Sequence, residues 1–538
     1  MRISAAAISI ALLVTTACAG GGGSSSTGTN TGTNPTGLTL TAQAGDAQIT
    51  FSFNAVTGAT AYTLYYGTST GVTTATGTAV PMVASPFALP GLSNGTRYYA
   101  VATYTNAQGE SAPTTQVSAV PQAAATGSPY DPTWANIAPT STMQHPYNSG
   151  QTAAQNGTAL KTAMLALTAG QKLEIAAGTY QYSSNFTLNI QGTAAAPIWI
   201  CPAPGATVVI HMNTTGQNIL NIGSGSQTRY LCIRGLEFTG GSHGLRFYDC
   251  TQVWLDQCEI HGTGDAGIST NTVDTSYLYI TRNEIHDTDG TGEGMYLGAN
   301  NGAVKMSNSI IALNHVYDTN AASVSQGDGI ELKQGSFGNL IAENHVHDTK
   351  YPCILVYGTA GAAQNIVERN VCYRSGDNAM QIQGECIVRN NLVISAAGSA
   401  FASQVHQGNP TNLQVVHNTF VNSATAARLS SWNGASNMVF ANNACYSNGT
   451  ALNVIGGNTG ITFAGNVCFG SVTGTTTGFV AGNGLSDFTS MSFDASNRNA
   501  IPTSGSALLG AASTTHATPK DIEGTNRVAP HDTGCYEG

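Results

Sequence analysis

The sequence predicts an all-β protein in which a parallel β-helix, residues 158–538, follows a small β-sandwich at residues 38–121. Two observations predict the β-helix. The motif Asn-x-apolar recurs eight times between Asn283 and Asn466, at intervals of 21 to 31 residues, and the runs between the motifs alternate polar and apolar residues with period two. A repeat made only of short strands and turns buries its apolar face by stacking on its neighbours, as a β-helix does.

The composition restricts the class of partner. The chain has 538 residues, of which only 9% are charged, and its net charge is −10. A nucleic-acid-binding protein needs a dense positive surface, so we expect no nucleic acid partner. Eleven of the 18 Lys and Arg residues lie between Arg229 and Arg428, which indicates that these cations have a functional role in this region.

The N-terminus predicts export. Residues 1–19 combine Arg2 with a short apolar run at 8–14, too short to span a bilayer. Residues 15–18 (TTAC) resemble a bacterial lipobox, which predicts lipidation at Cys18 and makes residues 20–37 a flexible tether. Residues 17–19 (ACA) also fit ordinary signal cleavage. We expect an exported monomer, either a cell-surface lipoprotein of the outer membrane or an extracellular protein, that contacts a membrane only through this anchor.

Residues 38–121 contain short alternating strands such as AQITFSF, AYTLYYGT and RYYAVATYT. The stretch 89–113 resembles the end of a fibronectin type III domain, with Leu92, Thr96 and Tyr98 before the last strands and Asn106 and Gly109 in the following turn. The resemblance implies a spacer or weak binding module, and we assign it no chemistry. Residues 122–157 are interpreted as a linker that leads into the β-helix.

Three sets of polar residues recur at fixed places in the repeats. The Asn of each motif is predicted to form a hydrogen-bonded ladder and to adopt the left-handed backbone of a sharp corner. A second ladder is predicted to cap turns, and a third to stack its rings without forming a transition-metal site. The second comprises Asp287, Asp318 and Asp348, and the third His261, His286, Tyr317, His347 and Tyr373.

Alternation assigns the two faces of each strand. In GIELK, Ile330 and Leu332 point inward, so Glu331 and Lys333 point outward. The same rule selects outward rings, amides and cations on equivalent strands, which would suit a sugar chain. These candidate substrate-binding residues are Tyr248, Asn271, Tyr296, Gln381, Gln383 and Arg428. The alternative is an exposed sheet with mixed polar residues and no ligand.

Acidic residues precede these strands. Asp265, Glu293 and Asp328 lie on consecutive coils and are expected to stack close to Glu331. Stacked carboxylates repel one another, which raises their pKa values or recruits a cation. These four residues therefore form a candidate Ca²⁺ site, because Ca²⁺ prefers oxygen ligands. The alternative is turn chemistry, since Asp beside Gly is common at tight turns.

Residues 159–180, 192–210 and 230–238 resemble the opening of right-handed β-helix polysaccharide lyases of the alginate lyase and chondroitinase B type. Residues 519–538 resemble the closing segment of many secreted bacterial β-helix proteins, which predicts a structural cap. The resemblance implies a right-handed coil and β-elimination on a polysaccharide that contains uronic acids. It also implies a Lys base, an Arg acid partner one coil later, and Ca²⁺ held by an Asn and two Glu.

These expectations assign the catalytic base to Lys333. The coil after it offers Tyr357 in place of the family's Arg, so the candidate acid is Tyr357, Arg246 or Arg374. Gly329 replaces the first Glu of the family's Glu-x-Glu. Because nearby carboxylates favour a protonated lysine, the base role requires Ca²⁺ to absorb their charge. A glycoside hydrolase, which uses paired carboxylates, a uronan epimerase and a non-catalytic glycan-binding adhesin remain alternatives.

The eleven cysteines show no CxxC motif and no compact disulfide framework. The repeat alignment places Cys445 and Cys468 in matching inward positions on adjacent coils.

Overall fold

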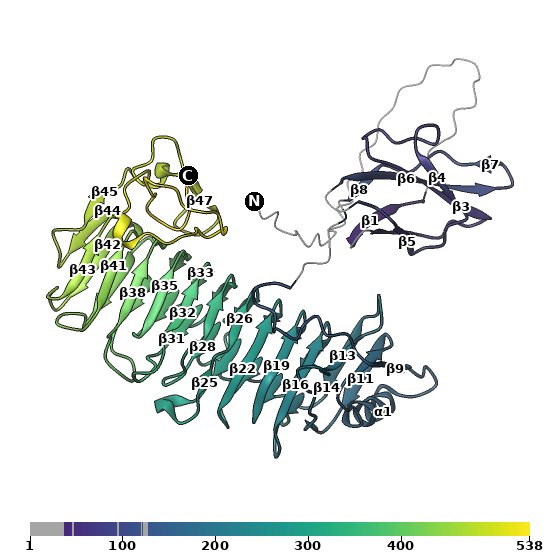
Figure 1. Cartoon of the computed structure of the whole chain (residues 1–538), viewed down its shortest axis with the longest axis horizontal. Coiled ribbons are helices and arrows are strands. Elements are labelled where there is room, and N and C mark those ends of the chain that lie inside the picture. The colour runs from purple at the N-terminus through teal and green to yellow at the C-terminus, as the bar shows by residue number, and fades with distance from the viewer. Residues whose placement is uncertain (1–36, 46–47, 94–95, 120, 122–126) are drawn as a thin grey trace. The chain divides into compact units, whose positions relative to one another are not determined.

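A computed structural model describes residues 37–45, 48–93, 96–119, 121 and 127–538, which form two compact units (Figure 1). The signal-like segment, Cys18 and the tether up to residue 36 lie outside the described residues, so export and lipidation stay predictions. Within the described ranges, no helix combines the length and the apolar character that crossing a bilayer requires.

The first unit is a small β-sandwich of antiparallel strands. One sheet has the order β1-β2-β5 (Leu40–Gly45, Gln48–Phe53, Phe87–Pro90). The other has the order β4-β3-β6-β7 (Thr78–Pro81, Ala61–Gly67, Tyr98–Asn106, Gly109–Glu110), and β8 (Val117–Ala119) also pairs with β6. Ile49, Phe51 and Leu64 are buried between the sheets. The predicted sandwich is confirmed, whereas its fibronectin type III character stays a resemblance.

The second unit, from Tyr130 to Gly538, is a solenoid of parallel strands. One face is a single sheet with the order β9, β10, β13, β16, β19, β22, β26, β29, β32, β35, β38, β41 and β43 (Ser141–His145, Gln171–Ile175, Ile198–Pro202, Thr228–Arg234, Cys250–Asp256, Thr275–Thr281, Ile310–Ala312, Leu340–Ala342, Asn365–Glu368, Cys386–Arg389, Leu413–Val416, Met438–Ala441, Ile461–Ala464). From β10 onward each of these strands is followed by one or two strands of the second sheet, and the predicted parallel β-helix is confirmed.

The second sheet holds two columns of stacked strands. On the first coils, β12 (Thr187–Leu188) leads into the first column named below, and β11 (Gly178–Tyr182) and β14 (Val208–Met212) lead into the second. We call the column that contains Lys333 the lysine column. Its members are β15, β18, β21, β24, β28, β31, β34, β37 and β40 (Leu220–Ile222, Leu245–Phe247, Ile268–Ser269, Met295–Leu297, Ile330–Leu332, Ile354–Val356, Met380–Ile382, Ser399–Ser403, Thr425–Ser430). We call the other the ring column. Its members are β17, β20, β23, β27, β30, β33, β36 and β39 (Glu237–Gly240, Glu259–His261, Glu284–His286, His315–Thr319, His345–Thr349, Val371–Ser375, Leu392–Ala396, Thr419–Val421). The long strand β42 (Ala444–Ile455) continues both columns, and β44 (Asn466–Thr473) follows it.

The N-terminal end of the solenoid carries the only α-helix among the described residues, α1 (Ala153–Leu165), which packs on β11 (Gly178–Tyr182). A capping box between Thr152 and Gln155 starts the helix. Residues 130–157, which the sequence assigns to a lead-in, pack on the solenoid. The buried Trp134 lies edge-on to Trp199 and Trp254, with ring centroids 6.0 Å from each.

The Asn ladder is confirmed. Asn344 donates from both its backbone N–H and its Nδ2 to Oδ1 of Asn370, each at 3.0 Å, and the same pair of bonds recurs along the ladder. Its members are Asn283, Asn314, Asn344, Asn370, Asn391, Asn418, Asn443 and Asn466.

The backbone part of that prediction is wrong. The left-handed conformation falls on the residue before each Asn, for example Leu313 (φ 61°) and Glu343 (φ 53°). That residue turns the corner, so the Asn after it directs its amide inside the coil. In the Asp ladder the acids themselves are left-handed, with φ of 51–54° at Asp287, Asp318 and Asp348, as a turn role requires.

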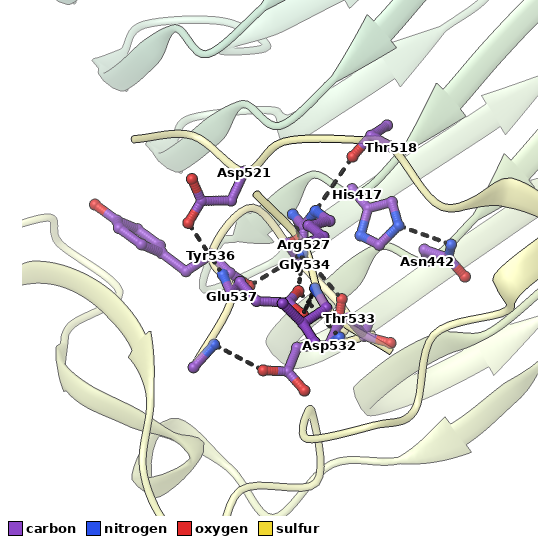
Figure 2. A network of polar contacts seen from close by, with 12 residues as sticks. His417, Asn442, Thr518, Asp521, Arg527, Asp532, Thr533, Gly534, Tyr536 and Glu537 are labelled. Carbon is purple, nitrogen blue, oxygen red and sulfur yellow. Dashed lines mark hydrogen bonds and ion pairs between the residues drawn. The ribbon is translucent and has the colours of Figure 1, made fainter. Parts of the chain in front are cut away.

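The C-terminal segment packs along the flank of the last coils. Apolar residues such as Phe488, in β46 (Phe488–Met491), and Leu508 contact residues that run from Tyr373 in β33 to Val467 in β44. Figure 2 shows its polar anchor, the fully buried side chain of Arg527, which bonds Glu537 at 2.8 Å. The segment thus covers several successive coils along the side of the ring column.

The inward positions match the sequence alignment. Cys445 pairs in register with Cys468, and both thiols are buried, as predicted. The ten cysteines among the described residues are all free thiols.

Candidate functional site

The lysine column brings the predicted catalytic and substrate-binding residues to matching positions on successive coils. Tyr296, Glu331, Leu355 and Gln381 occupy one position on successive coils, and the backbone bonds place Lys333 one coil before Tyr357. The inward Ile330 and Leu332 are fully buried in the core, so the assignment of faces by alternation is confirmed. Local alternation therefore sets which groups share this face.

The exposure of this face differs from the prediction. Lys333 is only 2% exposed, and Glu331, Tyr357, Gln381 and Gln383 are also buried. The other candidate residues are half-buried: Arg246, Tyr248, Asn271, Tyr296 and Arg428. The expectation of an open surface is wrong at its centre, because a loop folds over these strands.

That cover is formed by residues 404–409, which we call the roof loop. Gln407 accepts from the Asn301 N–H at 2.8 Å and donates to Asn300 Oδ1 at 3.0 Å, in the short 3₁₀ helix Asn300–Gly302 after β24. At its other side, His406 contacts Gln381 and Tyr357. The loop thus crosses the strands between β24 and β34, including the one that carries Glu331.

Lys333 lies between two rings. Its Nζ is 4.2 Å from the centroid of Tyr296 and 5.3 Å from that of Tyr357. The amine also donates a hydrogen bond to Oε1 of Glu331. The predicted neighbourhood of lysine, glutamate and tyrosines is therefore present, inside the protein.

A chain of hydrogen bonds ends at Glu331. The Gln381 Nε2 donates to His406 Nδ1 (2.6 Å), so His406 Nε2 carries the proton that faces the Tyr357 hydroxyl (3.2 Å). Tyr357 in turn donates to Glu331 Oε1 (3.1 Å). Burial and Glu331 raise the pKa of Tyr357, while burial and the Lys333 charge lower the pKa of His406. Near neutral pH, Tyr357 is a phenol and His406 a neutral imidazole.

Three buried carboxylates adjoin this chain. Oxygen atoms of Glu293, Asp328 and Glu331 lie within 4.8 Å of one another. One oxygen of each carboxylate has no hydrogen-bond partner among the described residues. Burial, followed by the Glu331 and Glu293 charges, raises the pKa of Asp328 far above its usual range, and burial raises that of Glu293.

Such a group fits a cation. Unpaired buried carboxylate oxygens are costly, and a divalent ion is the partner that would satisfy all three at once. Asp265 is not part of this group. Glu293 and Asp328 precede the paired residues Met295 and Ile330 by two positions, whereas Asp265 precedes Ile268 by three. Asp265 is linked to Glu293 through the Thr291 hydroxyl, which lies within hydrogen-bond distance of both carboxylates and donates its one proton to either of them.

The candidate arginines lie away from Lys333, and Arg374 bonds Asp348 in the ring column. Arg246 is three strands from Glu331 along the column, about 14 Å at the usual strand spacing. It donates to Asn271 Oδ1 at 2.9 Å and packs over the Tyr248 ring. Arg428 lies on the other side, four strands away, and bonds Gln404. None of these arginines reaches the atoms around Lys333.

Comparison with known proteins agrees with this architecture. The family model for a right-handed β-helix region matches residues 208–363. The chain carries a right-handed parallel β-helix. No curated protein matches the sequence.

Solved structures similar to this β-helix share little sequence with it. An alginate lyase from Paenibacillus sp. has 20% identity and a TM-score of 0.38, over 55% of this chain and 95% of that one. A mannuronic acid-specific family 6 lyase from human gut microbiota has 12% identity and a TM-score of 0.38, over 63% and 90%. The A-module of a mannuronan C-5 epimerase from Azotobacter vinelandii has 12% identity and a TM-score of 0.29, over 61% and 95%. These similarities are similarities of fold alone.

Sequence reasoning missed His406. It lies in the roof loop after β37, where no alternation assigns a direction to its side chain. The sequence offered one signal, a single His flanked by glutamines in the segment SQVHQGNP between two strands. The contact of His406 with Tyr357 arises only from the tertiary fold.

Proposed function

We propose that this β-helix protein is a carbohydrate-active enzyme, a lyase that cleaves an acidic, uronic-acid-containing polysaccharide by β-elimination. The observation that carries the proposal is the buried cluster in which Lys333 lies between Tyr296 and Tyr357, beside three carboxylates with unpaired oxygens. An amine, a phenol and a cation-binding group within one cluster are what this reaction needs.

We propose Ca²⁺ as the cation, held by Glu293, Asp328 and Glu331. Without it, a uronate would approach three buried acids, which is electrostatically unfavourable. When bound, the ion supplies positive charge that stabilises the charge developing on the substrate carboxylate during proton abstraction.

Lys333 is proposed as the base. Its Nζ, free of its own proton, takes the proton from the carbon next to the uronate carboxylate. The electron pair of that C–H bond forms a carbon–carbon double bond, and the bond from the next carbon to the glycosidic oxygen breaks. Glu331, which now holds the amine by a hydrogen bond, fixes its position.

Tyr357 is proposed as the acid that protonates the departing oxygen. Its raised pKa keeps the phenol protonated until that oxygen develops charge. His406 is then a positioning residue, because its Nε2–H faces the phenolate that remains. The half-buried Arg246, Tyr248, Asn271 and Arg428 extend along the same column and are proposed to bind sugar units away from the cleavage point.

The test is incubation with alginate, pectate and glycosaminoglycans, followed by the ultraviolet absorbance of the unsaturated product. We expect product from at least one of these polymers. Lys333→Ala and Tyr357→Phe are each expected to lower the rate by about 10²- to 10⁴-fold, the range of general acid–base catalysis. Lys305→Ala, at an exposed lysine near the same coils, is the matched control and should retain the rate.

Chelation with EDTA should remove the activity, and added Ca²⁺ should restore it. New reducing ends without ultraviolet absorbance would identify a hydrolase, and changed sugar configuration without cleavage an epimerase. Binding without any chemical change would identify an adhesin. Each of these outcomes contradicts the lyase proposal.

A further inference from the structure

The ring column carries a second cluster that the lyase proposal does not use. The predicted stacking of the ring ladder is confirmed: His261, His286, Tyr317, His347 and Tyr373 stack in order with centroids 4.6–5.4 Å apart. The proposal below departs from the expectation that this ladder forms no transition-metal site. Two residues earlier on β27 and β30 lie His315 and His345, which are in register with each other. Sequence reasoning overlooked this second position, although its side chains face the same way.

Three histidines from these two positions on β27 and β30 lie close together. The ring centroids of His315, His345 and His347 are each 5.0 Å from the other two. The Nε2 atoms of His315 and His347 are 2.9 Å apart, and one ring nitrogen from each of the three lies within 4.8 Å of the others. In a tetrahedral zinc site the nitrogens lie about 2.0–2.1 Å from the ion and therefore about 3.3 Å from one another. Small ring rotations convert one arrangement into the other.

A neighbouring carboxylate orients one of these rings. The Nδ1–H of His347 donates to Asp348 Oδ2 at 2.6 Å, so its Nε2 presents a lone pair to the cluster. The Nδ1 of His315 lies 3.9 Å from Glu284 Oε1, which is too far for a hydrogen bond, so Glu284 contributes only its nearby charge. Histidines that bind metals commonly donate their second nitrogen to a carboxylate, as His347 does.

The charges around the cluster are mixed. Glu284 and Asp348 face it from the ring column, and Arg374 and Arg498 lie close enough to affect His345. Arg374 is engaged by Asp348 through two hydrogen bonds, which reduces its repulsion of a cation. Burial lowers the pKa of all three histidines, that of His345 to about 3, so the rings are neutral at physiological pH.

We propose that His315, His345 and His347 bind one zinc ion, with the fourth position open to solvent. The geometry of three converging imidazoles, with His347 hydrogen-bonded to Asp348, carries this inference. The side chain of His315 is 40% exposed, so both the ion and a water ligand can reach the site. Because the ligands come from two adjacent coils, the ion would also link those coils.

The test uses untagged protein, freed of metal with EDTA and dialysed, then titrated with Zn²⁺ against a chromophoric chelator. We expect one zinc per chain at micromolar or tighter affinity. His315→Gln, at the most accessible ligand, should weaken binding by at least about 100-fold. Asp348→Asn, which only orients His347, should weaken it by about 10- to 100-fold.

Two controls locate the ion. His261→Gln changes another histidine of the ring column and should leave the affinity unchanged. Glu331→Gln disrupts the acidic cluster and should also leave it unchanged. Loss of zinc in the Glu331 variant would place the ion there and overturn the proposal, as would full affinity in the His315 variant or no binding by the wild type. Cobalt substitution is a second measurement, since a visible spectrum of a four-coordinate ion must appear in the wild type and vanish in His315→Gln.

Discussion

At the scale of single residues, Asn370 illustrates how the coils hold together. Its Oδ1 accepts two bonds from Asn344, and its Nδ2 donates to the Ile341 carbonyl and to Asn391. The side chain is fully buried, so water cannot replace these partners. Each ladder Asn therefore stabilises three coils.

We expect Asn370→Ala to lower the free energy of unfolding by about 3 kcal/mol, since each buried donor or acceptor left unpaired costs about 1–3 kcal/mol. Denaturant unfolding monitored by circular dichroism measures the loss. Asn320→Ala, at an exposed asparagine, is the control and should change little. Equal free energies of unfolding for the two variants would show that the Asn ladder does not stabilise the β-helix.

His417 gives a dependence of stability on pH. Its side chain is buried beside Asn442 under the C-terminal segment (Figure 2), and burial together with Arg527 lowers its pKa to about 2. The unfolded chain binds the proton near pH 6.5, whereas the folded protein does not. This contribution to stability is therefore complete above about pH 6.5 and is lost as the pH falls, by up to about 1.4 kcal/mol per unit.

The matched variant is His417→Gln, which cannot titrate. Its free energy of unfolding should fall less between about pH 6.5 and 4.5 than that of the wild type. Unfolding in urea at several pH values supplies both curves. If the two stability curves run parallel, His417 takes up a proton in the folded protein while its side chain stays in the buried position.

At the scale of elements, the roof loop determines access to Lys333. Its end toward β24 is held by the two bonds of Gln407 to Asn300 and Asn301. We expect Gln407→Ala to open the loop more often, because these bonds have no substitute among the described contacts of that side chain. Acetylation of Lys333 by an amine reagent, followed by mass spectrometry, should be several-fold faster in this variant.

The control for that experiment is the exposed Lys305, whose acetylation rate should be the same in both proteins. If Lys333 reacts at the wild-type rate in Gln407→Ala, then the contacts of His406 with Tyr357 and Gln381 hold the loop shut by themselves.

At the scale of the whole molecule, the β-helix begins earlier than its repeats. Trp134 and β9 belong to the unit that starts at Tyr130, and β9 pairs with β10. We expect a fragment of residues 130–538 to melt at the temperature of the β-helix in the full chain. A fragment of residues 158–538 should melt lower, because it exposes Trp199, Trp254 and the edge of β10 and also loses the capping box and first turn of α1. Differential scanning calorimetry compares them, and equal melting temperatures would contradict the role of the leading segment.

Much of this fold was predictable because it is local. Alternation with period two assigned Ile330 and Leu332 to the core, and the repeated Asn gave the spacing of the coils. The burial of Lys333 was not predictable in this way, since it depends on residues 404–409, far along the chain and without alternation. The cluster of His315, His345 and His347 was not predicted for a related reason. His315 contacts His347 diagonally, from one strand to the neighbouring one, and alternation within a strand does not reveal such a contact.

The Asn ladder also bears on how such a protein can change in length. Successive members repeat the same bonds: Nδ2 donates to Oδ1 of the next Asn and also to a backbone carbonyl of the preceding coil. An inserted or deleted coil that brings its own asparagine leaves no amide unmatched, whereas a partial coil breaks the series. Growth or shortening by whole coils is therefore the change that this architecture tolerates best. Outside β26–β31 it would leave the lysine and histidine clusters side by side, because both lie on the same two coils, with His315 and Glu331 on one and His347 and Tyr357 on the next.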